Sequence, residues 1–140
     1  MRYMMIVKAS PESETGVLPT AEQLAEMGKY NEELVKAGIM LAGEGLHDSS
    51  KGVRVRYQGK QRSIVDGPFT ESKELVAGFW ILQVRSKEEA IEWAKRVPFE
   101  DGEVELRQVF ETEEFAASDP TGELRAAEHE LRARVEAQNR

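Results

Sequence analysis

The chain turns sharply at Asp66-Gly67-Pro68-Phe69, between two segments with β-type patterns. Gly67 can adopt a positive φ, Pro68 fixes its own φ, and a proline disfavours the α region for the residue before it. Phe69 can bury its ring beside the turn and anchor it. We therefore expect a rigid corner that holds the Asp66 carboxylate in place and leads the chain into a central strand.

Apolar periodicity predicts four core strands around this corner. Residues 2–8 and 74–85 are apolar on both alternations, which is typical of central strands covered on both faces. Two more core strands are predicted at 39–46 and 103–110. Gln58-Gly59 turns an inserted hairpin, expected at a margin of the sheet. Its first strand is expected to bury one face only, formed by Val53, Val55 and Tyr57.

Two capping boxes mark the helices between these strands. Thr20 and Gln23 open the first helix, Gly38 ends it, and its expected inward residues are Leu24, Met27, Leu34 and Val35. Ser86 and Glu89 open the second helix, Pro98 stops it, and its expected inward residues are Ala90, Ile91, Ala94 and Val97. The resulting order is β-α-β-hairpin-β-α-β, an α+β chain with the ferredoxin-like plan. Helices on one face leave the other face to be covered, and a second copy of the chain is the simplest cover.

The run that starts at the corner, DGPFTESKELVAGFW at 66–80, resembles the DGPF subgroup of the YCII-related proteins. The resemblance covers about residues 1 to 111. It implies a dimeric α+β barrel, formed by a homodimer, with a pocket for an unknown small molecule. We place this domain at 1–112 and a polar, helical C-terminal extension at 113–140. The extension has a narrow apolar stripe that either docks on the partner subunit or stays solvated: Leu124, Ala127, Leu131 and Val135.

Composition excludes several classes of site. The chain has no cysteine, which excludes disulfides, thiolate metal sites, iron–sulfur clusters and a thiol nucleophile. Only two histidines are present, and no spacing recommends a metal site, so we expect no metal and no cofactor. The apolar run at 4–7 is too short for a signal peptide or a membrane span, so we expect a cytoplasmic protein.

The charge is unevenly distributed. The net charge of −7 argues against non-specific binding to nucleic acid or to an anionic membrane. Within 51–62, however, five basic residues stand without an acid, so this stretch carries +5 and the remainder −12. These residues are Lys51, Arg54, Arg56, Lys60 and Arg62. They either protect an exposed hairpin from edge-to-edge pairing or contact an anionic partner.

Two residues are candidates for proton transfer. Asp66 at the rigid corner can act as a general base or as a ligand acceptor, although an aspartate before Gly-Pro also caps turns. His47 has a side chain whose pKa suits a proton shuttle, although a lone histidine in a loop is often a surface residue. In the wider family, an aspartate and a histidine have been suggested as an active-site pair.

Seven further residues are expected to line the cavity as ligand-binding groups: Glu44, Phe69, Glu71, Lys73, Trp80, Glu105 and Arg107. Glu105 and Arg107 alternate with apolar neighbours that should face the helices, so they should point to the opposite face. There they form either a structural ion pair or, through Arg107, a site for an anionic group. Core packing is the alternative for Trp80.

Two function classes follow. As an enzyme, the protein would perform cofactor-free acid/base chemistry on a small carbonyl compound or lactone, by analogy with other dimeric α+β barrels. As a non-enzymatic protein, it would be a sensor or regulatory accessory linked to extracytoplasmic-function sigma factors, beside which family members are often encoded. An enzyme needs at least two convergent ionisable groups in its pocket, whereas a sensor's pocket can be largely apolar.

Overall fold

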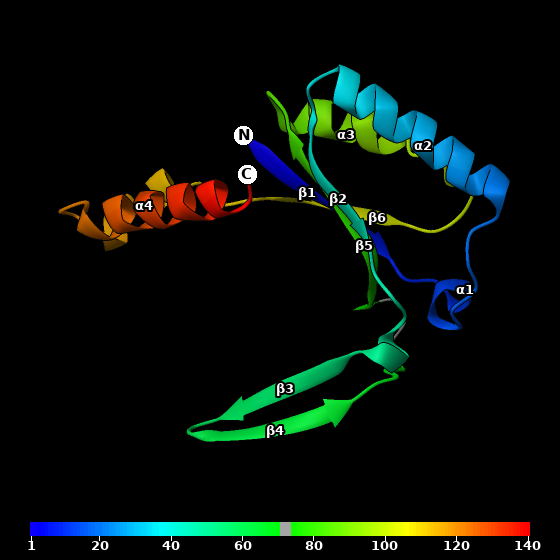
Figure 1. The fold of residues 1–140 in the computed structure, drawn as a ribbon, viewed down its shortest axis with the longest axis horizontal. Helices are drawn as coiled ribbons and strands as arrows, with labels where there is room; N and C mark the ends of the chain where they lie inside the picture. Colours follow the sequence, from blue (N-terminus) through cyan, green and yellow to red (C-terminus); the bar gives the residue numbers. More distant parts are fainter. Residues whose placement is uncertain (71–73) are drawn as a thin grey trace. The chain divides into compact units, whose positions relative to one another are not determined.

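The predicted order of strands and helices is confirmed in the computed structural model, which describes residues 1–70 and 74–140 (Figure 1). Four strands form an antiparallel sheet in the order β2-β5-β1-β6, which is the ferredoxin-like arrangement. Their bounds are β1 Arg2–Lys8, β2 Met40–Gly45, β5 Val76–Gln83 and β6 Val104–Gln108. The chain divides into two compact units, Met1–Gln108 and Val109–Arg140.

Helices α2 (Ala21–Lys36) and α3 (Lys87–Lys95) contribute to one core with one face of the sheet. The Thr20–Gln23 capping box forms as predicted, and Gly38 ends α2 with a φ of +71°. At α3 the Ser86 hydroxyl accepts the Glu89 N–H, but the Glu89 carboxylate pairs with Arg85 at 3.3 Å. The loop expected after β1 contains a one-turn helix, α1 (Pro11–Glu14).

The core is built from alternate residues of the two central strands. Tyr3 and Met5 of β1 and Trp80 and Leu82 of β5 are buried toward the helices, where they meet Leu34 of α2. The predicted inward stripe of α2 is partly wrong, because Leu24 and Val35 are 59% and 62% exposed. The helix buries Tyr30 instead. Its ring meets Trp80 and Trp93 edge-on, with ring centroids 5.7 and 6.4 Å apart, so aromatic contacts set the rotation of the helix.

Tyr30 gives the fold a predicted pH dependence. Burial is the main cause that raises the pKa of Tyr30 to about 12 from 10.0, with a neighbouring Arg96 opposing the shift. The folded chain therefore keeps this proton while the unfolded chain loses it, so stability is fully present below pH 10 and is lost as pH rises to 12. We expect a loss of roughly 2 to 3 kcal/mol over this range.

Urea denaturation of the parent and of Tyr30→Phe at a series of alkaline pH values checks this. The variant also loses the hydrogen bond from the Tyr30 hydroxyl to the Trp93 carbonyl, at 2.7 Å, and is expected to be less stable at neutral pH. The difference between the two proteins should shrink above pH 10. A difference that stays constant would contradict a raised pKa at Tyr30.

The sheet face opposite the helices carries apolar side chains that are only half buried. Met4 and Ile6 of β1 lie opposite Ile81 and Phe79 of β5 in the strand register. We call these four side chains the open face. Their pattern agrees with the double-sided apolar alternation in the sequence.

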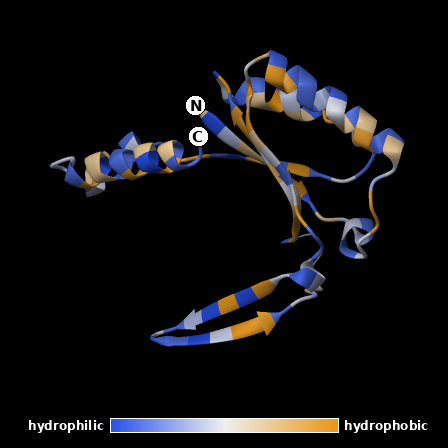
Figure 2. Ribbon diagram, viewed as in Figure 1, coloured by the Kyte–Doolittle hydropathy of each residue, from blue (hydrophilic) through white to orange (hydrophobic). Residues whose placement is uncertain are grey.

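The inserted hairpin differs from its prediction. Strands β3 (Val53–Gln58) and β4 (Gln61–Asp66) turn at Gly59, as expected, but they form a two-stranded sheet of their own. The face expected to be buried is exposed, with Val53, Val55 and Tyr57 at 55%, 45% and 72%. Figure 2 shows hydrophobic and hydrophilic residues alternating along β3. The alternation is real, but no described element of the Met1–Gln108 unit covers its apolar side.

The C-terminal unit contains a 3₁₀ helix, η3 (Thr112–Ser118), and helix α4 (Glu123–Gln138). The Asp119 carboxylate accepts hydrogen bonds from the N–H groups of Leu124 and Arg125 at 3.3 and 2.9 Å. It therefore caps the N-terminus of α4, although Asp119 itself lies before the helix. The backbone hydrogen bond from Arg125 is the main cause that lowers the pKa of Asp119. The extension is helical as predicted, and Leu124, Leu131 and Val135 of its stripe are exposed. None of the helices in residues 1–70 and 74–140 is long and apolar enough to span a bilayer.

Candidate functional site

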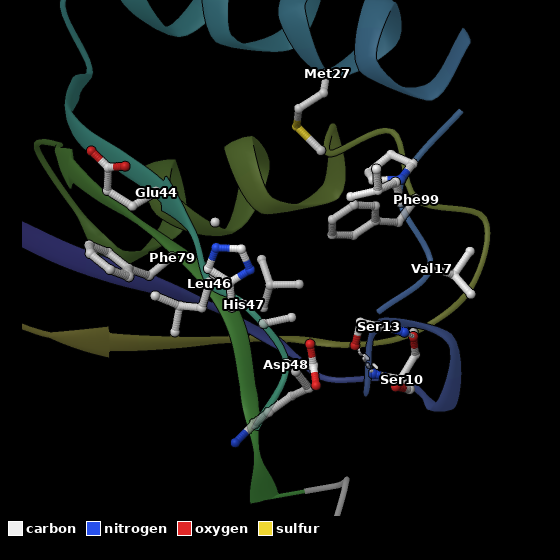
Figure 3. Close-up of a pocket in the computed structure, with 18 of the residues that line it drawn as sticks. Ser10, Ser13, Val17, Met27, Glu44, Leu46, His47, Asp48, Phe79 and Phe99 are labelled. Atoms are coloured by element: carbon white, nitrogen blue, oxygen red, sulfur yellow. Dashed lines mark hydrogen bonds between the residues drawn. The ribbon is translucent and has the colours of Figure 1, made fainter. Parts of the chain in front are cut away.

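A pocket of about 900 Å³ lies where β2 ends and β5 begins (Figure 3). Its apolar walls come from segments far apart in the chain: Val17 and Leu18 before α2, Met27 of α2, Phe79 of β5 and Phe99 after α3. Polar groups enter from the loop after β2, from the region of α1 and from α2. A mostly apolar pocket with a few placed polar groups is typical of small-molecule sites.

Two glycines let the walls approach each other. A Cβ at Gly43 would lie 2.7 Å from Met40 Cε and 2.9 Å from Trp80 Cδ1, so only glycine lets the indole lie against β2. A Cβ at Gly78 would lie 2.8 Å from the Glu44 carbonyl oxygen. Close packing therefore explains the glycine at position 43.

Trp80 in turn fixes Asn31, a pocket residue that the sequence analysis missed. The indole N–H of Trp80 donates to Asn31 Oδ1 at 2.9 Å. Because an indole can only donate, this bond defines which end of the amide is the oxygen. The bond uses only the amide oxygen. The Asn31 NH₂ group has no hydrogen-bond partner among the described residues, so it can donate to a ligand oxygen. No sequence pattern marks this residue, since its partner lies in a strand 49 positions away.

His47 and Asp48 follow β2 and line the same pocket. Figure 3 shows the exposed His47 ring in the pocket, with Met27 and Phe99 on one side of it and Ser13 and Asp48 on the other. Asp48 is the N-cap of a short 3₁₀ helix, η1 (Ser49–Lys51). The Ser50 hydroxyl, which donates to this carboxylate, is the main cause that lowers the pKa of Asp48. A charged carboxylate thus stands next to the imidazole in the chain.

Ser10 and Ser13 were also missed. Each side-chain oxygen accepts the backbone N–H of the other residue, at 2.8 and 3.1 Å, and the Ser13 hydroxyl donates to the Ser10 carbonyl at 3.0 Å. This is a capping box for α1, and the sequence Ser10-Pro11-Glu12-Ser13 carries the signal. Both serines line the pocket, but their hydroxyls are already engaged in the cap.

The corner at 66–69 does not line the pocket, but its backbone forms hydrogen bonds with the segment that follows His47. The Phe69 N–H donates to Ser49 Oγ at 2.9 Å, and the Gly67 N–H donates to the Gly52 carbonyl at 3.0 Å. Ser49 then donates its N–H at 2.9 Å, and its hydroxyl, to the Glu14 carboxylate of α1. The corner, the segment after His47 and α1 are therefore linked through Ser49.

The structure places Asp66 and Phe69 away from the pocket. Asp66 is exposed at the end of β4, opposite Val53, and no described residue donates a hydrogen bond to its carboxylate, so the expected turn cap finds no donor. The Phe69 ring lies 3.8 Å from the Arg54 guanidinium, a cation–π contact. Neither residue is among the described residues that line the pocket, so their predicted site roles gain no geometric support.

The remaining predicted ligand groups divide between two places. Glu44 and Trp80 line the pocket. Glu105 and Arg107 lie across from Ile6 and Met4, on the open face as predicted, and form an ion pair at 3.2 Å, while Lys8 also reaches Glu105 at 3.3 Å. The hydrogen bond from Arg107, and then that from Lys8, lowers the pKa of Glu105. Glu71 and Lys73 lie outside the described residues.

The described part of the chain contains no group of three or more His, Asp or Glu residues that could hold a metal ion. The ionisable and amide groups that line the pocket are an imidazole, an amide, separate carboxylates and the ammonium groups of Lys8 and Lys51. Such a set can move a proton and hold a polar atom of a ligand.

The model of the YCII-related domain matches residues 1–115. The chain belongs to the YCII-related family. Among curated relatives, an uncharacterized protein of Rhizobium meliloti (strain 1021) is 25% identical over 72 residues, which are 51% of this chain and 58% of that protein. This YCII-related chain therefore spans little more than half the length of the curated relative that it matches.

The comparison with solved structures found a similarity that concerns the outline of the fold. The similar structure is a 5-chloro-2-hydroxyhydroquinone dehydrochlorinase from Burkholderia phenoliruptrix, in complex with 2,5-dihydroxybenzoquinone. The identity is 16% and the TM-score 0.41, and the match covers 79% of this chain and 94% of that one.

Proposed function

We propose that this YCII-related protein, of the DGPF subgroup by the motif at 66–69, is a homodimeric α+β barrel that binds a small carbonyl compound or lactone. We further propose that it performs cofactor-free acid/base chemistry on this ligand. The observation that carries the proposal is the His47 imidazole, which stands in a pocket of about 900 Å³ with mostly apolar walls.

The pocket supports a proton transfer next to a carbonyl group. A neutral imidazole can remove a proton from the carbon beside the carbonyl, and the C–H electrons then form a C=C bond while the carbonyl electrons move to the oxygen. The Asn31 NH₂ can donate to that oxygen. Asp48, whose pKa is lowered mainly by the Ser50 hydroxyl, supplies a charged carboxylate among the residues that line the pocket. The proton goes to His47 rather than Asp66 because Asp66 does not line this pocket.

The homodimer is supported by the open face, whose apolar side chains are half exposed within one chain. A second sheet laid on this face would bury them and would place the Glu105–Arg107 pair in the interior of a barrel. Of the four open-face residues only Phe79 also lines the pocket, and His47 does not belong to the open face, so ligand binding and association can be tested at different residues.

The chemistry is tested by proton exchange in deuterium oxide. We expect the parent protein to catalyse deuterium incorporation beside the carbonyl of at least one member of a panel of small ketones and lactones, followed by NMR. His47→Gln should slow this exchange by about a hundredfold or more, the usual contribution of general acid/base catalysis. His129→Gln, in the C-terminal unit, is the matched control and should leave the rate unchanged.

Binding is measured on the same panel by amide chemical shifts. If a ligand shifts the pocket residues but no exchange occurs in the parent, the catalytic part of the proposal is wrong and the sensor function is favoured. If no panel member binds and no small molecule is extracted from the purified protein, the pocket is not a site for this class of ligand.

A further inference from the structure

The hydrogen bond between Trp80 and Asn31 fixes which polar group Asn31 can offer to the pocket. The Trp80 indole N–H donates to Asn31 Oδ1 at 2.9 Å, and an indole can only donate. If the Asn31 amide turned over, its NH₂ group would meet the indole N–H, so that two donors would face each other and a hydrogen bond would be lost. The amide oxygen therefore stays on Trp80, and the NH₂ group is the part of Asn31 that remains for another partner.

The indole itself is held in place by its neighbours. Trp80 is 6% exposed, and its ring meets the Tyr30 ring edge-on, with the centroids 5.7 Å apart. A Cβ at Gly43 would lie 2.9 Å from Trp80 Cδ1 and 3.2 Å from Trp80 Nε1, so the indole lies directly against the backbone of β2. A ring packed in this way cannot easily move its N–H away from Asn31.

The Asn31 NH₂ group is accessible. Asn31 lines the pocket and is half buried. In residues 1–70 and 74–140, no side-chain nitrogen or oxygen of such a residue is both fully buried and without a hydrogen-bond partner. The NH₂ group has no such partner in this part of the chain, so it is not fully buried. A ligand atom that meets it must be an acceptor, because an NH₂ group of an amide only donates.

We propose that Trp80 is a positioning residue, which makes the pocket select ligands with a hydrogen-bond acceptor at Asn31 and reject ligands with a donor there. Trp80 acts through Asn31, because its own N–H is already engaged. The oxygen of a ketone or lactone is a group of the selected kind, whereas an N–H group is of the rejected kind. The inference rests on the proposed ligand binding but not on the proposed proton transfer.

Three small ring compounds test the selection, with dissociation constants measured by NMR titration of the parent and its variants. Cyclopentanone offers only an acceptor and pyrrole only a donor. Thiophene has the shape of pyrrole without the N–H, so it reports changes in the size of the pocket. The affinities of pyrrole and cyclopentanone are therefore expressed relative to that of thiophene.

Trp80→Phe removes the indole N–H and keeps an aromatic ring. The Asn31 amide can then turn either way, so the share with its oxygen toward the ligand rises from roughly one in twenty to about one half. Pyrrole should bind about tenfold more tightly, whereas cyclopentanone should lose only about twofold. Trp93→Phe is the matched control and should change neither affinity, because Trp93 also meets Tyr30 edge-on but does not line the pocket.

Two further variants keep the test independent of the stability of Trp80→Phe. β-(3-Benzothienyl)alanine in place of Trp80 has the shape of tryptophan with sulfur instead of the N–H, and should give the same two changes. Asn31→Asp keeps one oxygen for the indole and places a second, charged oxygen where the NH₂ group was. Pyrrole should then bind at least about tenfold more tightly and cyclopentanone at least about tenfold more weakly, so the selection reverses.

Two outcomes would overturn this inference alone. The three compounds could change together when the indole N–H is removed, which would mean that Trp80 only shapes the pocket. Alternatively, Asn31→Asp could leave the relative affinities as in the parent, which would mean that Asn31 does not meet the ligand. If none of the three compounds binds the parent, the inference and the proposed ligand binding are both wrong. If the selection reverses but the parent catalyses no deuterium exchange, only the proposed chemistry is wrong.

Discussion

Gly67→Ala should lower the free energy of unfolding by about 3 kcal/mol or more, a large effect for one methyl group. A Cβ at this position would lie 1.7 Å from the Ser49 carbonyl oxygen and 2.7 Å from the Ser49 carbonyl carbon. Both atoms belong to the backbone, so no flexible side chain can move aside. Either the corner or the segment at Ser49 must shift. Urea denaturation of parent and variant measures the loss.

The shift should spread from Ser49 to the pocket. Ser49 accepts the Phe69 N–H and donates to Glu14, and it directly follows Asp48. We therefore expect the amide signals of the segment around His47 to change in this variant. Gly28→Ala is the control. Gly28 is exposed in α2 with nothing within 4 Å of a built Cβ, so alanine should stabilise the helix by roughly 0.5 to 1 kcal/mol. A Gly67→Ala protein as stable as the parent would mean that the corner is not packed on Ser49.

The order of the elements could be predicted because local rules agree along the Met1–Gln108 unit. Double-sided apolar alternation marked β1 and β5, a capping box and a left-handed glycine bounded α2, and Gly59 marked the hairpin turn. Each of these signals lies within one segment. None of them depends on knowing which segments meet in space.

The site was harder to predict because it is assembled from separate segments. The motif at 66–69 predicted a site residue at Asp66. In the structure the motif instead packs on Ser49 and forms a hydrogen bond with it, beside the pocket. Asn31 owes its place to Trp80, and the burial of Tyr30 depends on Trp80 and Trp93. Tertiary contacts of this kind leave no periodic trace in the sequence.

The hairpin also shows that a sequence pattern does not reveal which tertiary contacts a segment makes. Its alternation correctly placed Val53, Val55 and Tyr57 on one side, but alternation does not say whether the cover of that side lies within the chain. For β5, one side is covered by helices of the same chain and the other is left half exposed. The double-sided pattern of β5 therefore does not say what covers the second side, and the proposed second copy can be tested on the open face.

Ile81→Asp should convert the protein to a monomer. Ile81 lies between Met4 and Ala42 in the strand register, near the middle of the open face. In the proposed dimer its carboxylate would be buried against apolar side chains with no designed partner, which should weaken association by at least about a hundredfold. Within one chain this position is half exposed, so the monomer should stay folded. Sedimentation should therefore give about twice 15.8 kDa for the parent and 15.8 kDa for the variant.

Leu24→Asp is the control that distinguishes burial of a charge at the open face from the general effect of added negative charge. Leu24 is a large apolar residue on α2 that is 59% exposed, and its side chain lies outside the core between the helices and the sheet. The same substitution there adds the same charge to an apolar position away from the open face, so the dimer should persist. If Ile81→Asp remains dimeric, the second copy does not cover the open face. If Leu24→Asp dissociates as well, added negative charge rather than burial controls association, because a chain of net charge −7 already repels its own copy.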